Sequence, residues 1–407
     1  MQLVSKSVCS GCSACYAACP RHAIKMVADK EDFLRPQIDV ALCVNCGLCA
    51  KVCPSLNRGE PREPIAVYAA QAHDTDLRLK SSSGGIFSLL ARQVISRGGI
   101  VFGAGFDHAD WRVIHKSAEN EEELEDLRGS KYVQSDMGDT FAAVKRELAT
   151  GREVLFVGTP CQVAGLRNYL HHSAPTSNAY TSNLLTADLI CHAAPSPLAW
   201  RKYLEQRTAE SASAKGRISA PAEGRNIRRI SFRQKNFGWK RFSLSLRFAN
   251  GKEYLVDLKN DPFLRGFLSE LYNRPSCHNC QCRELRSGSD LTIADYWGVA
   301  ARFPDMDDDC GTSLILVNTE KGFAVLSTVD DAMIKIPSDY GHVKVVNSAV
   351  YKSKAAHKNR DRFFKCVSRS GFDRAVSVSL RASFYQRVRL VIDQVIGRVV
   401  RIIQFRK

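Results

Sequence analysis

Two cysteine runs with the spacing C-x2-C-x2-C-x3-C-P constrain this chain more than any other feature of its sequence. The first run, CSGCSACYAACP, occupies residues 9–20, and the second, CVNCGLCAKVCP, occupies residues 43–54. Three cysteines at this spacing wrap a tight loop around one face of an iron–sulfur cubane, and the fourth ligates the neighbouring cluster. Neither run completes a site alone, so the pair predicts one small domain that holds two [4Fe–4S] clusters.

The interlocked spacing also assigns each ligand. The first cluster takes Cys9, Cys12, Cys15 and Cys53, and the second takes Cys43, Cys46, Cys49 and Cys19. Zinc sites or disulfides are the alternative, but zinc sites typically have longer gaps between their cysteine pairs. Over residues 5–56 the chain resembles two-cluster bacterial ferredoxins, which implies a one-electron relay. We therefore expect a ferredoxin domain over residues 1–58.

The rest of the chain is long enough for a further domain and has an ordinary globular composition. Of its 407 residues, 44% are hydrophobic and 25% are charged. No apolar stretch of about 18 residues predicts a transmembrane helix, and the N-terminus lacks the apolar core of a signal peptide. Without an export signal, fifteen cysteines in clustered spacings favour metal binding over disulfides. We expect a cytoplasmic protein.

Strand-like and helix-like segments alternate after a linker at residues 57–65. The apolar segments IVFGAGF, EVLFVG and LLTADLIC are strand-like, and segments with helical spacing lie between them. This alternation predicts an α/β layer around a largely parallel sheet, followed by a β-rich segment. The predicted fold class is mixed α+β and α/β, in which a ferredoxin-like domain precedes a main domain at 66–350, an insertion-like loop at 207–226 and a helical tail at 351–407.

Four further cysteines stand where a third metal site is expected. Cys161 and Cys191 each follow a strand-like segment, and ligands gather at the carboxyl ends of strands in doubly wound sheets. Cys277 and Cys280 form a C-x2-C pair in a polar loop. Together these four would complete one more four-thiolate site. The spacing alone leaves rivals open, namely Cys282 and Cys310 as thiol ligands, and His192 and His278 as ligands of a zinc site.

An iron–sulfur relay normally needs a partner that converts single electrons into pairs, and flavin is the usual converter. The segment SSSGG, with Ser83, Gly84 and Gly85, stands before a helix and would present hydroxyl and N–H groups to a pyrophosphate. Lys131 and Tyr132 in RGSKYVQS would neutralise phosphate and stack on a ring. Each segment also fits a plain helix cap or a solvated loop. The nicotinamide fingerprint G-x-G-x-x-G is not met.

Seven stretches in order resemble the family of coenzyme F420 hydrogenase/dehydrogenase beta subunits, here fused to a ferredoxin domain. They are SSSGGIFSLLA, RGSKYVQS, VGTPCQVAGL, LICHAAPSP, SFRQKNFGW, CHNCQCRELRSGSDLTIADYWG and GTSLILVNTEKG. The resemblance covers residues 66–350 and implies FAD and one [4Fe–4S] cluster in that region. It supports Cys161, Cys191, Cys277 and Cys280 as cluster ligands. It also implies flavin contacts by Ser83, Gly84, Gly85, Lys131 and Tyr132, and we add Thr159 beside Cys161.

The sequence departs from the family pattern at two positions. Cys282 replaces the usual aromatic residue after the C-x2-C pair, and Ala294 stands where many members carry glycine. The family uses this core for oxidation or reduction of coenzyme F420, for reduction of chlorophyll precursors and for electron delivery to sulfite-reducing partners. Bacterial members often accompany cell-surface polysaccharide genes. Fold and cofactors therefore transfer from the resemblance better than the substrate does.

These features lead us to expect an FAD- and iron–sulfur-dependent oxidoreductase. Electrons would pass between the ferredoxin clusters, the third cluster and FAD, which exchanges a hydride with a deazaflavin-like or other organic carrier. Lys131, Tyr132 and His192 are the catalytic candidates. The alternative is an electron-transfer subunit without its own substrate that feeds a partner enzyme. A redox sensor with Cys310 or Cys282 as its responsive thiol is a third hypothesis.

The tail carries over half of the net positive charge of this chain. The net charge is +16, and residues 360–407 contain twelve Lys or Arg against three Asp. No nucleic-acid-binding motif accompanies this charge. From Phe384 onward, apolar residues recur at helical spacing, which predicts an amphipathic basic helix. Such a helix packs on the body, lies on an anionic membrane surface or docks a partner. Co-sedimentation of intact and tail-deleted chains with anionic vesicles separates these alternatives.

Overall fold

The computed structural model describes residues 3–173, 182–213 and 227–381. The predicted tail helix beyond Phe384 lies outside these ranges. So does most of the expected insertion-like loop, but residues 207–213 are not loop: they continue helix α9 (Pro197–Ser213). Within the described ranges no helix is both long and apolar enough to cross a bilayer.

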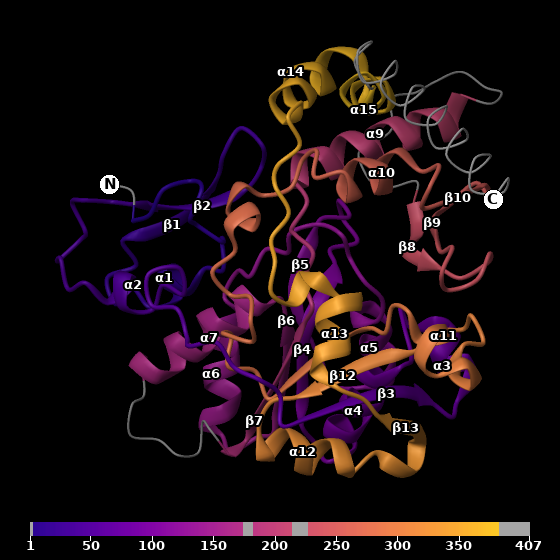
Figure 1. The fold of residues 1–407 in the computed structure, drawn as a ribbon. Coiled ribbons are helices and arrows are strands. Elements are labelled where there is room, and N and C mark those ends of the chain that lie inside the picture. Colours follow the sequence, from indigo (N-terminus) through magenta and orange to yellow (C-terminus); the bar gives the residue numbers. More distant parts are fainter. Residues whose placement is uncertain (1–2, 174–181, 214–226, 382–407) are drawn as a thin grey trace, which may run out of the picture.

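The ferredoxin domain has the compact form that the twin cysteine runs predict. Each run contains a short helix, α1 (Ala14–Ala17) in the first and α2 (Leu48–Lys51) in the second, so that each fourth cysteine follows a helical turn. Strands β1 (Ile24–Ala28) and β2 (Leu34–Ile38) pair antiparallel between the runs. In Figure 1 this domain, in indigo, lies beside α7 at one side of the large sheet.

The main domain is built on an eight-stranded sheet in the order β13-β3-β12-β11-β7-β6-β4-β5. Four neighbouring strands, β11, β7, β6 and β4, run parallel, but the remaining pairings are antiparallel, so the expectation of a largely parallel sheet was wrong. Parallel pairing needs a long crossover, whereas β4 and β5 are joined by a short loop and must pair antiparallel. The strands are β3 (Ala66–Ala72), β4 (Ile100–Phe106), β5 (Val113–Ala118), β6 (Val154–Gly158), β7 (Leu184–Leu189), β11 (Leu291–Asp295), β12 (Ser313–Val317) and β13 (Met333–Pro337).

Helices cover both faces of this sheet, because its buried strands alternate apolar side chains between the two sides. Val101 packs with α3, α4, α5 and α12 on one face, whereas Ile100 and Phe102 pack with α6 and α7 on the other. The second core also includes Cys12 and Val52, so the ferredoxin domain shares it. The helices are α3 (Thr75–Lys80), α4 (Ile86–Ser96), α5 (Glu121–Leu127), α6 (Thr140–Ala149), α7 (Pro160–Ser173), α11 (Val299–Arg302), α12 (Glu320–Ser327) and α13 (Tyr340–Val346).

A third layer joins the predicted β-rich segment to the helices at the top of Figure 1. Its antiparallel strands surround an aromatic core that includes Trp200, Phe232 and Phe263. The elements are β8 (Ile227–Gln234), β9 (Ser243–Phe248), β10 (Glu253–Asp257), α9, α10 (Pro262–Leu268), α14 (Arg360–Ser370) and α15 (Phe372–Leu380). Short 3₁₀ turns complete the fold: η1 (Pro275–Asn279), η2 (Pro304–Met306), η3 (Asp330–Ala332) and η4 (Ser348–Val350).

Buried polar contacts fix the ferredoxin domain to this third layer. The Glu31 carboxylate pairs with both terminal nitrogens of Arg360 on α14, at 2.9 and 2.5 Å. The Ser196 hydroxyl donates to the Glu31 carbonyl at 2.7 Å, and at the surface nearby Arg201 pairs with Asp32 at 2.8 Å. The side chains of Glu31 and Arg360 are 8% and 12% exposed, so either charge would be stranded without the other.

Substitution of Arg360 by methionine is therefore expected to lower the free energy of unfolding by about 3–5 kcal/mol, because it leaves a buried carboxylate unpaired. Anaerobic urea titration measures the change. Arg362→Met removes an exposed arginine from the same helix and is expected to change stability by less than about 0.5 kcal/mol. Glu31→Met combined with Arg360→Met should recover much of the loss, and equal losses in Arg360→Met and Arg362→Met would contradict the role of this pair.

Candidate iron–sulfur and flavin sites

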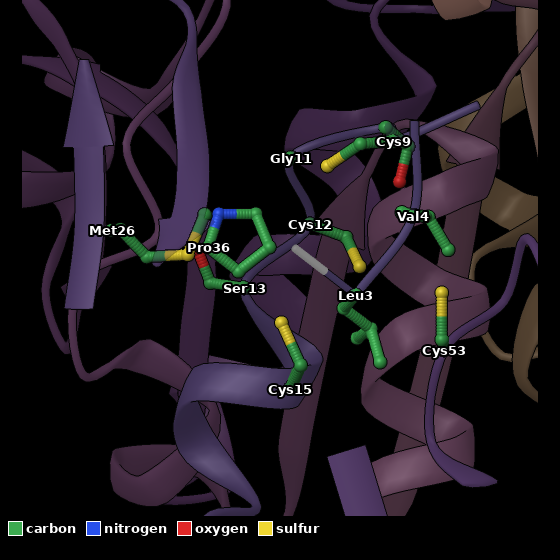
Figure 2. Close-up of a pocket in the computed structure, with 11 residues that line it drawn as sticks. Leu3, Val4, Cys9, Gly11, Cys12, Ser13, Cys15, Met26, Pro36 and Cys53 are labelled. Carbon is green, nitrogen blue, oxygen red and sulfur yellow. The ribbon is translucent and has the colours of Figure 1, made fainter. Parts of the chain in front are cut away.

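The four thiols predicted for the first cluster face one cavity. Cys9, Cys12, Cys15 and Cys53 line it, together with apolar side chains such as Leu3, Met26 and Pro36 (Figure 2). Burial, together with the nearby Cys9 and Cys53 thiols, raises the pKa of Cys15 to about 12. The thiolate forms of these cysteines repel one another, which requires that the sulfur atoms lie near one another. The cavity therefore suits a group that takes thiolate ligands.

The second predicted quartet lies at the outer end of the ferredoxin domain. Burial raises the pKa of Cys49, an effect that the Ala50 amide opposes and that Cys46, Cys19 and Cys43 reinforce. The Ala23 amide donates to the Cys19 sulfur at 3.3 Å. Cys46 is exposed, unlike the thiols of the first quartet. This quartet is thus the one nearest to solvent.

The third predicted quartet forms although its members are far apart in the sequence. Cys161 follows β6 and begins α7, Cys191 follows β7, and Cys277 and Cys280 belong to the turn η1 and the residue after it. Burial raises the pKa of Cys191 strongly, and Cys277, Cys161 and Cys280 raise it further. The Ala194 amide donates to the Cys277 sulfur at 3.4 Å. The four thiols therefore converge at the carboxyl ends of neighbouring strands, as the sheet argument predicts.

The rival ligands occupy different positions. Cys282 is buried against this quartet, and a hydrogen bond from its thiol lowers the pKa of Cys280. Cys310 lies elsewhere, in a loop where its own backbone carbonyl accepts a hydrogen bond from the Lys235 ammonium at 2.6 Å. His192 pairs with Glu270 at 2.6 Å, and His278 contacts the Lys354 carbonyl at 2.9 Å. Cys282 is thus a neighbour of the third quartet, and Cys310 is not.

The zinc and disulfide alternatives each require sulfur atoms that lie close together. All fifteen cysteines are free. Throughout the described ranges, no three Cys, His, Asp or Glu side chains converge closely enough to hold one metal ion. A tetrahedral zinc site with Zn–S bonds of about 2.3 Å requires sulfurs only about 3.8 Å apart. The C-x2-C-x2-C-x3-C-P spacing of the two runs is therefore the ground on which we expect cubane clusters.

The three quartets follow one another through the protein. Cys15 of the first quartet lies within electrostatic reach of Cys49 of the second, and Cys12 lies within reach of Cys161 of the third. Helix α7 packs directly on the first loop: a β-carbon added to Gly165 would lie 3.0 Å from the Cys12 sulfur. The thiols therefore form a continuous series from the exposed Cys46 to Cys191, which follows the carboxyl end of β7.

The serine- and glycine-rich turn predicted to hold pyrophosphate is packed into the sheet. The Ser83 hydroxyl donates to the Thr312 carbonyl at 2.8 Å, and the Gly84 amide donates to the Ser313 hydroxyl at 2.9 Å. A β-carbon on Gly84 would lie 2.3 Å from the Ala70 carbonyl oxygen, so glycine is needed for this approach. Gly85 takes a positive φ of 92° immediately before α4. Phosphate binding by the Ser83 hydroxyl or the Gly84 amide would require these bonds to be exchanged.

Lys131 and Tyr132 are neighbours in sequence but point to different surroundings. The Lys131 ammonium donates to the carbonyls of Asp126 and Arg128 at 2.7 and 2.8 Å, which satisfies the end of α5. Burial lowers the pKa of Lys131 to about 7. Its head group is thus engaged inside the protein, which differs from the phosphate-neutralising position that we expected.

Tyr132 faces a polar cluster that the sequence did not predict. Its hydroxyl accepts from Arg233 at 3.0 Å, and Arg233 also pairs with both oxygens of Asp295 at 2.8 and 3.1 Å. Arg233 further donates to the Ser82 carbonyl at 3.2 Å. Both charged residues stand inside stretches with family resemblance, SFRQKNFGW and ADYWG, and this was the only signal for them. The cluster joins the SSSGG turn to the Tyr132 loop.

Tyr132 and His192 flank the same aromatic side chain. Their ring centroids each lie 5.0 Å from that of Phe267. His192 immediately follows Cys191, so this contact connects the third quartet to the Tyr132 cluster. The Thr159 hydroxyl lies 3.2 Å from the Cys161 sulfur and is therefore placed at the third quartet. Of the three predicted catalytic residues, the structure brings Tyr132 and His192 together and turns Lys131 away.

Comparison with known families agrees with this architecture. Residues 8–57 match a 4Fe-4S dicluster domain. Residues 67–141 and 151–338 match the N-terminal and C-terminal models of the coenzyme F420 hydrogenase/dehydrogenase beta subunit. The protein is thus an iron–sulfur protein of an oxidoreductase class. More particularly, the chain belongs to the family of coenzyme F420 hydrogenase/dehydrogenase beta subunits and carries an N-terminal dicluster ferredoxin domain.

Individual relatives are more distant. An F(420)H(2) dehydrogenase subunit of Methanosarcina mazei is 25% identical over 179 residues, which make up 41% of this chain and 49% of that protein. The coenzyme F420-dependent sulfite reductase of Methanocaldococcus jannaschii is 26% identical over 168 residues, 41% of this chain and 26% of that protein. A chain of the F420-reducing [NiFe] hydrogenase complex from Methanosarcina barkeri superposes with a TM-score of 0.49 at 16% identity, over 72% of this chain and 90% of the other.

The buried Lys131 predicts a distinct pH dependence of stability. The pKa of Lys131 is about 7 in the folded state and about 10.4 in the unfolded chain. Between these two pH values the folded state binds fewer protons than the unfolded state, so the free energy of unfolding rises with pH. The free energy of unfolding of the native chain, relative to Lys131→Met, is expected to increase from pH 7 to pH 9 in anaerobic urea titrations. The exposed Lys80→Met serves as the control and should show a flat difference. If the difference in the free energy of unfolding between the native chain and Lys131→Met did not change with pH, the lowered pKa of Lys131 would be contradicted.

Proposed function

We propose that this chain is the iron–sulfur and flavin subunit of an F420-linked oxidoreductase, in which a hydride carrier of the deazaflavin class exchanges electrons with an iron–sulfur relay. The observation that carries this proposal is the continuous series of three thiol quartets from Cys46 to Cys191. Such a series serves electron transfer over distance, since one cluster alone would suffice for a structural role. The family membership and the names of the two relatives support the same class of reaction.

The arrangement separates a one-electron end from a two-electron end. FAD, when bound, would supply the conversion between a hydride, which carries two electrons, and the single electrons that iron–sulfur clusters accept. We place it beside Tyr132, Arg233 and the SSSGG turn, next to the third quartet. Arg233 donates to the Tyr132 hydroxyl there, and the Tyr132 ring packs on that of Phe267.

Tyr132 and His192 are the residues that we propose for proton handling. The His192 imidazole lies 2.6 Å from the Glu270 carboxylate. Burial raises the pKa of Glu270, but its contacts with His192 and Asn273 lower it below the ordinary value. The carboxylate therefore stays charged and holds the imidazole in a defined orientation. Lys131 is proposed as a structural support of this loop, because its ammonium binds two carbonyls of the chain.

An electron-transfer subunit that feeds a partner enzyme is the second candidate, and it rests on a different observation. Around the exposed Cys46, the side chains of Val40 and Val44 are 69% and 60% exposed. Neighbouring apolar residues on a surface favour contact with another protein. In both proposals a redox partner protein meets the second quartet. Only the first adds a small hydride carrier, and we propose no polysaccharide substrate because no described residue supports one.

Anaerobic purification followed by cofactor analysis separates the two candidates. Extractable FAD and bleaching of the flavin absorbance by reduced F420, but not by a reduced nicotinamide, are the expected results. A chain that contains clusters but neither binds FAD nor responds to any hydride donor would overturn the flavin proposal. Reduction by a ferredoxin-type donor alone would then favour the electron-transfer subunit.

The iron content tests the third quartet. The native chain is expected to contain about twelve iron atoms, four for each [4Fe–4S] cluster, and Cys161→Ser should reduce this number to about eight. Cys366→Ser alters a thiol on α14, outside the quartets, and should retain about twelve. Iron and acid-labile sulfide assays on the purified chains give the answer. A native content of about eight would remove the third cluster.

A further inference from the structure

Arg274 is a completely buried arginine that holds the first cysteine run. Its side chain is 0% exposed. Its guanidinium donates to the Cys9 carbonyl at 2.8 Å, to the Leu34 carbonyl at 2.9 Å and to the Gln134 side-chain oxygen at 2.6 Å. It also lies 3.6 Å from the Cys9 sulfur. All these acceptors are neutral groups, apart from the cysteine sulfur.

The charge of Arg274 has no carboxylate to balance it. Within the described ranges no acidic side chain lies in ion-pair distance of this guanidinium, whereas buried Arg35, Arg233 and Arg360 pair with Asp29, Asp295 and Glu31. An isolated charge in a protein interior costs many kcal/mol unless an opposite charge compensates it. The thiolates around Arg274 are the anions that remain for this purpose.

Arg274 stands between the first and the third quartets. It contacts Cys9 directly, and its own carbonyl accepts from the Cys277 amide at 2.9 Å. Burial raises the pKa of Cys161 and of Cys277, and the Arg274 guanidinium opposes this rise at both thiols. One cation is therefore within electrostatic reach of both quartets.

The first cysteine loop is shaped around this side chain. Gly11 has a φ of +72°, and a β-carbon built on it would lie 2.6 Å from a terminal nitrogen of Arg274. Any larger residue at this position would displace the guanidinium from Cys9. Gln134 completes the enclosure, because its amide donates to the Ser10 carbonyl while its oxygen accepts from Arg274. The site is thus built from three separate segments of the chain.

We propose that Arg274 is the shared counter-ion of the first and third clusters and that it sets the potential at which electrons cross between them. A [4Fe–4S] cluster with four thiolate ligands is anionic and gains one further negative charge on reduction, so a buried cation beside it stabilises the reduced form. The same cation lessens repulsion between two neighbouring anionic clusters. Arg274 is a positioning residue, and its role at the third cluster rests on the proposed function.

The test is a redox titration of the anaerobically purified full-length chain, monitored by the electron paramagnetic resonance of each reduced cluster. Arg274→Gln is expected to lower the equilibrium constant for reduction of the first and third clusters at least tenfold, which is about 59 mV for one electron. Arg274→Lys keeps the charge and should show a smaller shift in the same direction. The second cluster is an internal control and should keep its potential, because Arg274 contacts none of its predicted ligands.

Two matched variants separate charge from packing. Gln134→Leu removes a neutral partner of the same guanidinium and should change the equilibrium constant for reduction of each of the three clusters less than twofold. Arg283→Gln removes another buried arginine, which donates to the carbonyls of Cys191 at 3.2 Å and His192 at 3.1 Å, and should shift the third cluster alone. Loss of iron in Arg274→Gln with retention in Arg274→Lys would support the charge requirement as well.

Three results would overturn the proposal. They are unchanged potentials in Arg274→Gln, a shift in Gln134→Leu as large as that in Arg274→Gln, and equal loss of iron in Arg274→Gln, Arg274→Lys and Gln134→Leu. A native chain with only about eight iron atoms would refute the third cluster of the proposed function. In that case the change in reduction potential of the first cluster in Arg274→Gln still decides whether Arg274 acts as a counter-ion there.

Discussion

Burial of anionic sulfur is the constraint on which the rest of this structure depends. Two of the three quartets are largely enclosed, and uncompensated thiolates in such surroundings would destabilise the fold by many kcal/mol. The chain compensates with amide donors, such as Ala23 at Cys19 and Ala194 at Cys277. It also places Arg274 and Arg283 near the sulfur atoms, and neither guanidinium forms an ion pair with a carboxylate of the described residues. These groups belong to different segments, so the sulfur sites and the tertiary fold form together.

Close packing between the ferredoxin domain and α7 brings the first and third quartets near each other. Electron transfer requires neighbouring centres at short and fixed distances, and Gly165 permits the helix backbone to approach Cys12 without a side chain between them. The Glu31–Arg360 pair and the shared core around Val52 hold this arrangement from two other directions. A tethered domain joined only by a flexible linker would lack such geometry.

Sequence reasoning succeeded where chemistry depends on local spacing. The eight ferredoxin cysteines were predicted as ligands from their intervals alone, and residues 8–57 match a 4Fe-4S dicluster domain; the assignment of each ligand stays a prediction. The third quartet needed the strand-end argument and the family resemblance, because Cys161 and Cys277 lie far apart in the chain. Lys131 was expected at a phosphate, but its side chain instead donates to the carbonyls of Asp126 and Arg128 at the end of α5. The largely parallel sheet was wrong: a short loop makes β5 antiparallel to β4, and the pairings of β11 with β12, β12 with β3 and β13 with β3 are antiparallel as well.

The sequence by itself determined the chemical class of this protein, namely two interlocked iron–sulfur runs followed by an oxidoreductase body. That information is local, because the intervals between cysteines dictate how a loop wraps around a cluster. Only the tertiary structure decided which distant side chains share a site. The pairing of Tyr132 with Arg233, the separation of Cys310 from Cys282 and the place of Arg274 between two quartets all depend on packing between elements. Long-range packing is set by complementary shape and charge across the whole core, which no single stretch of sequence contains.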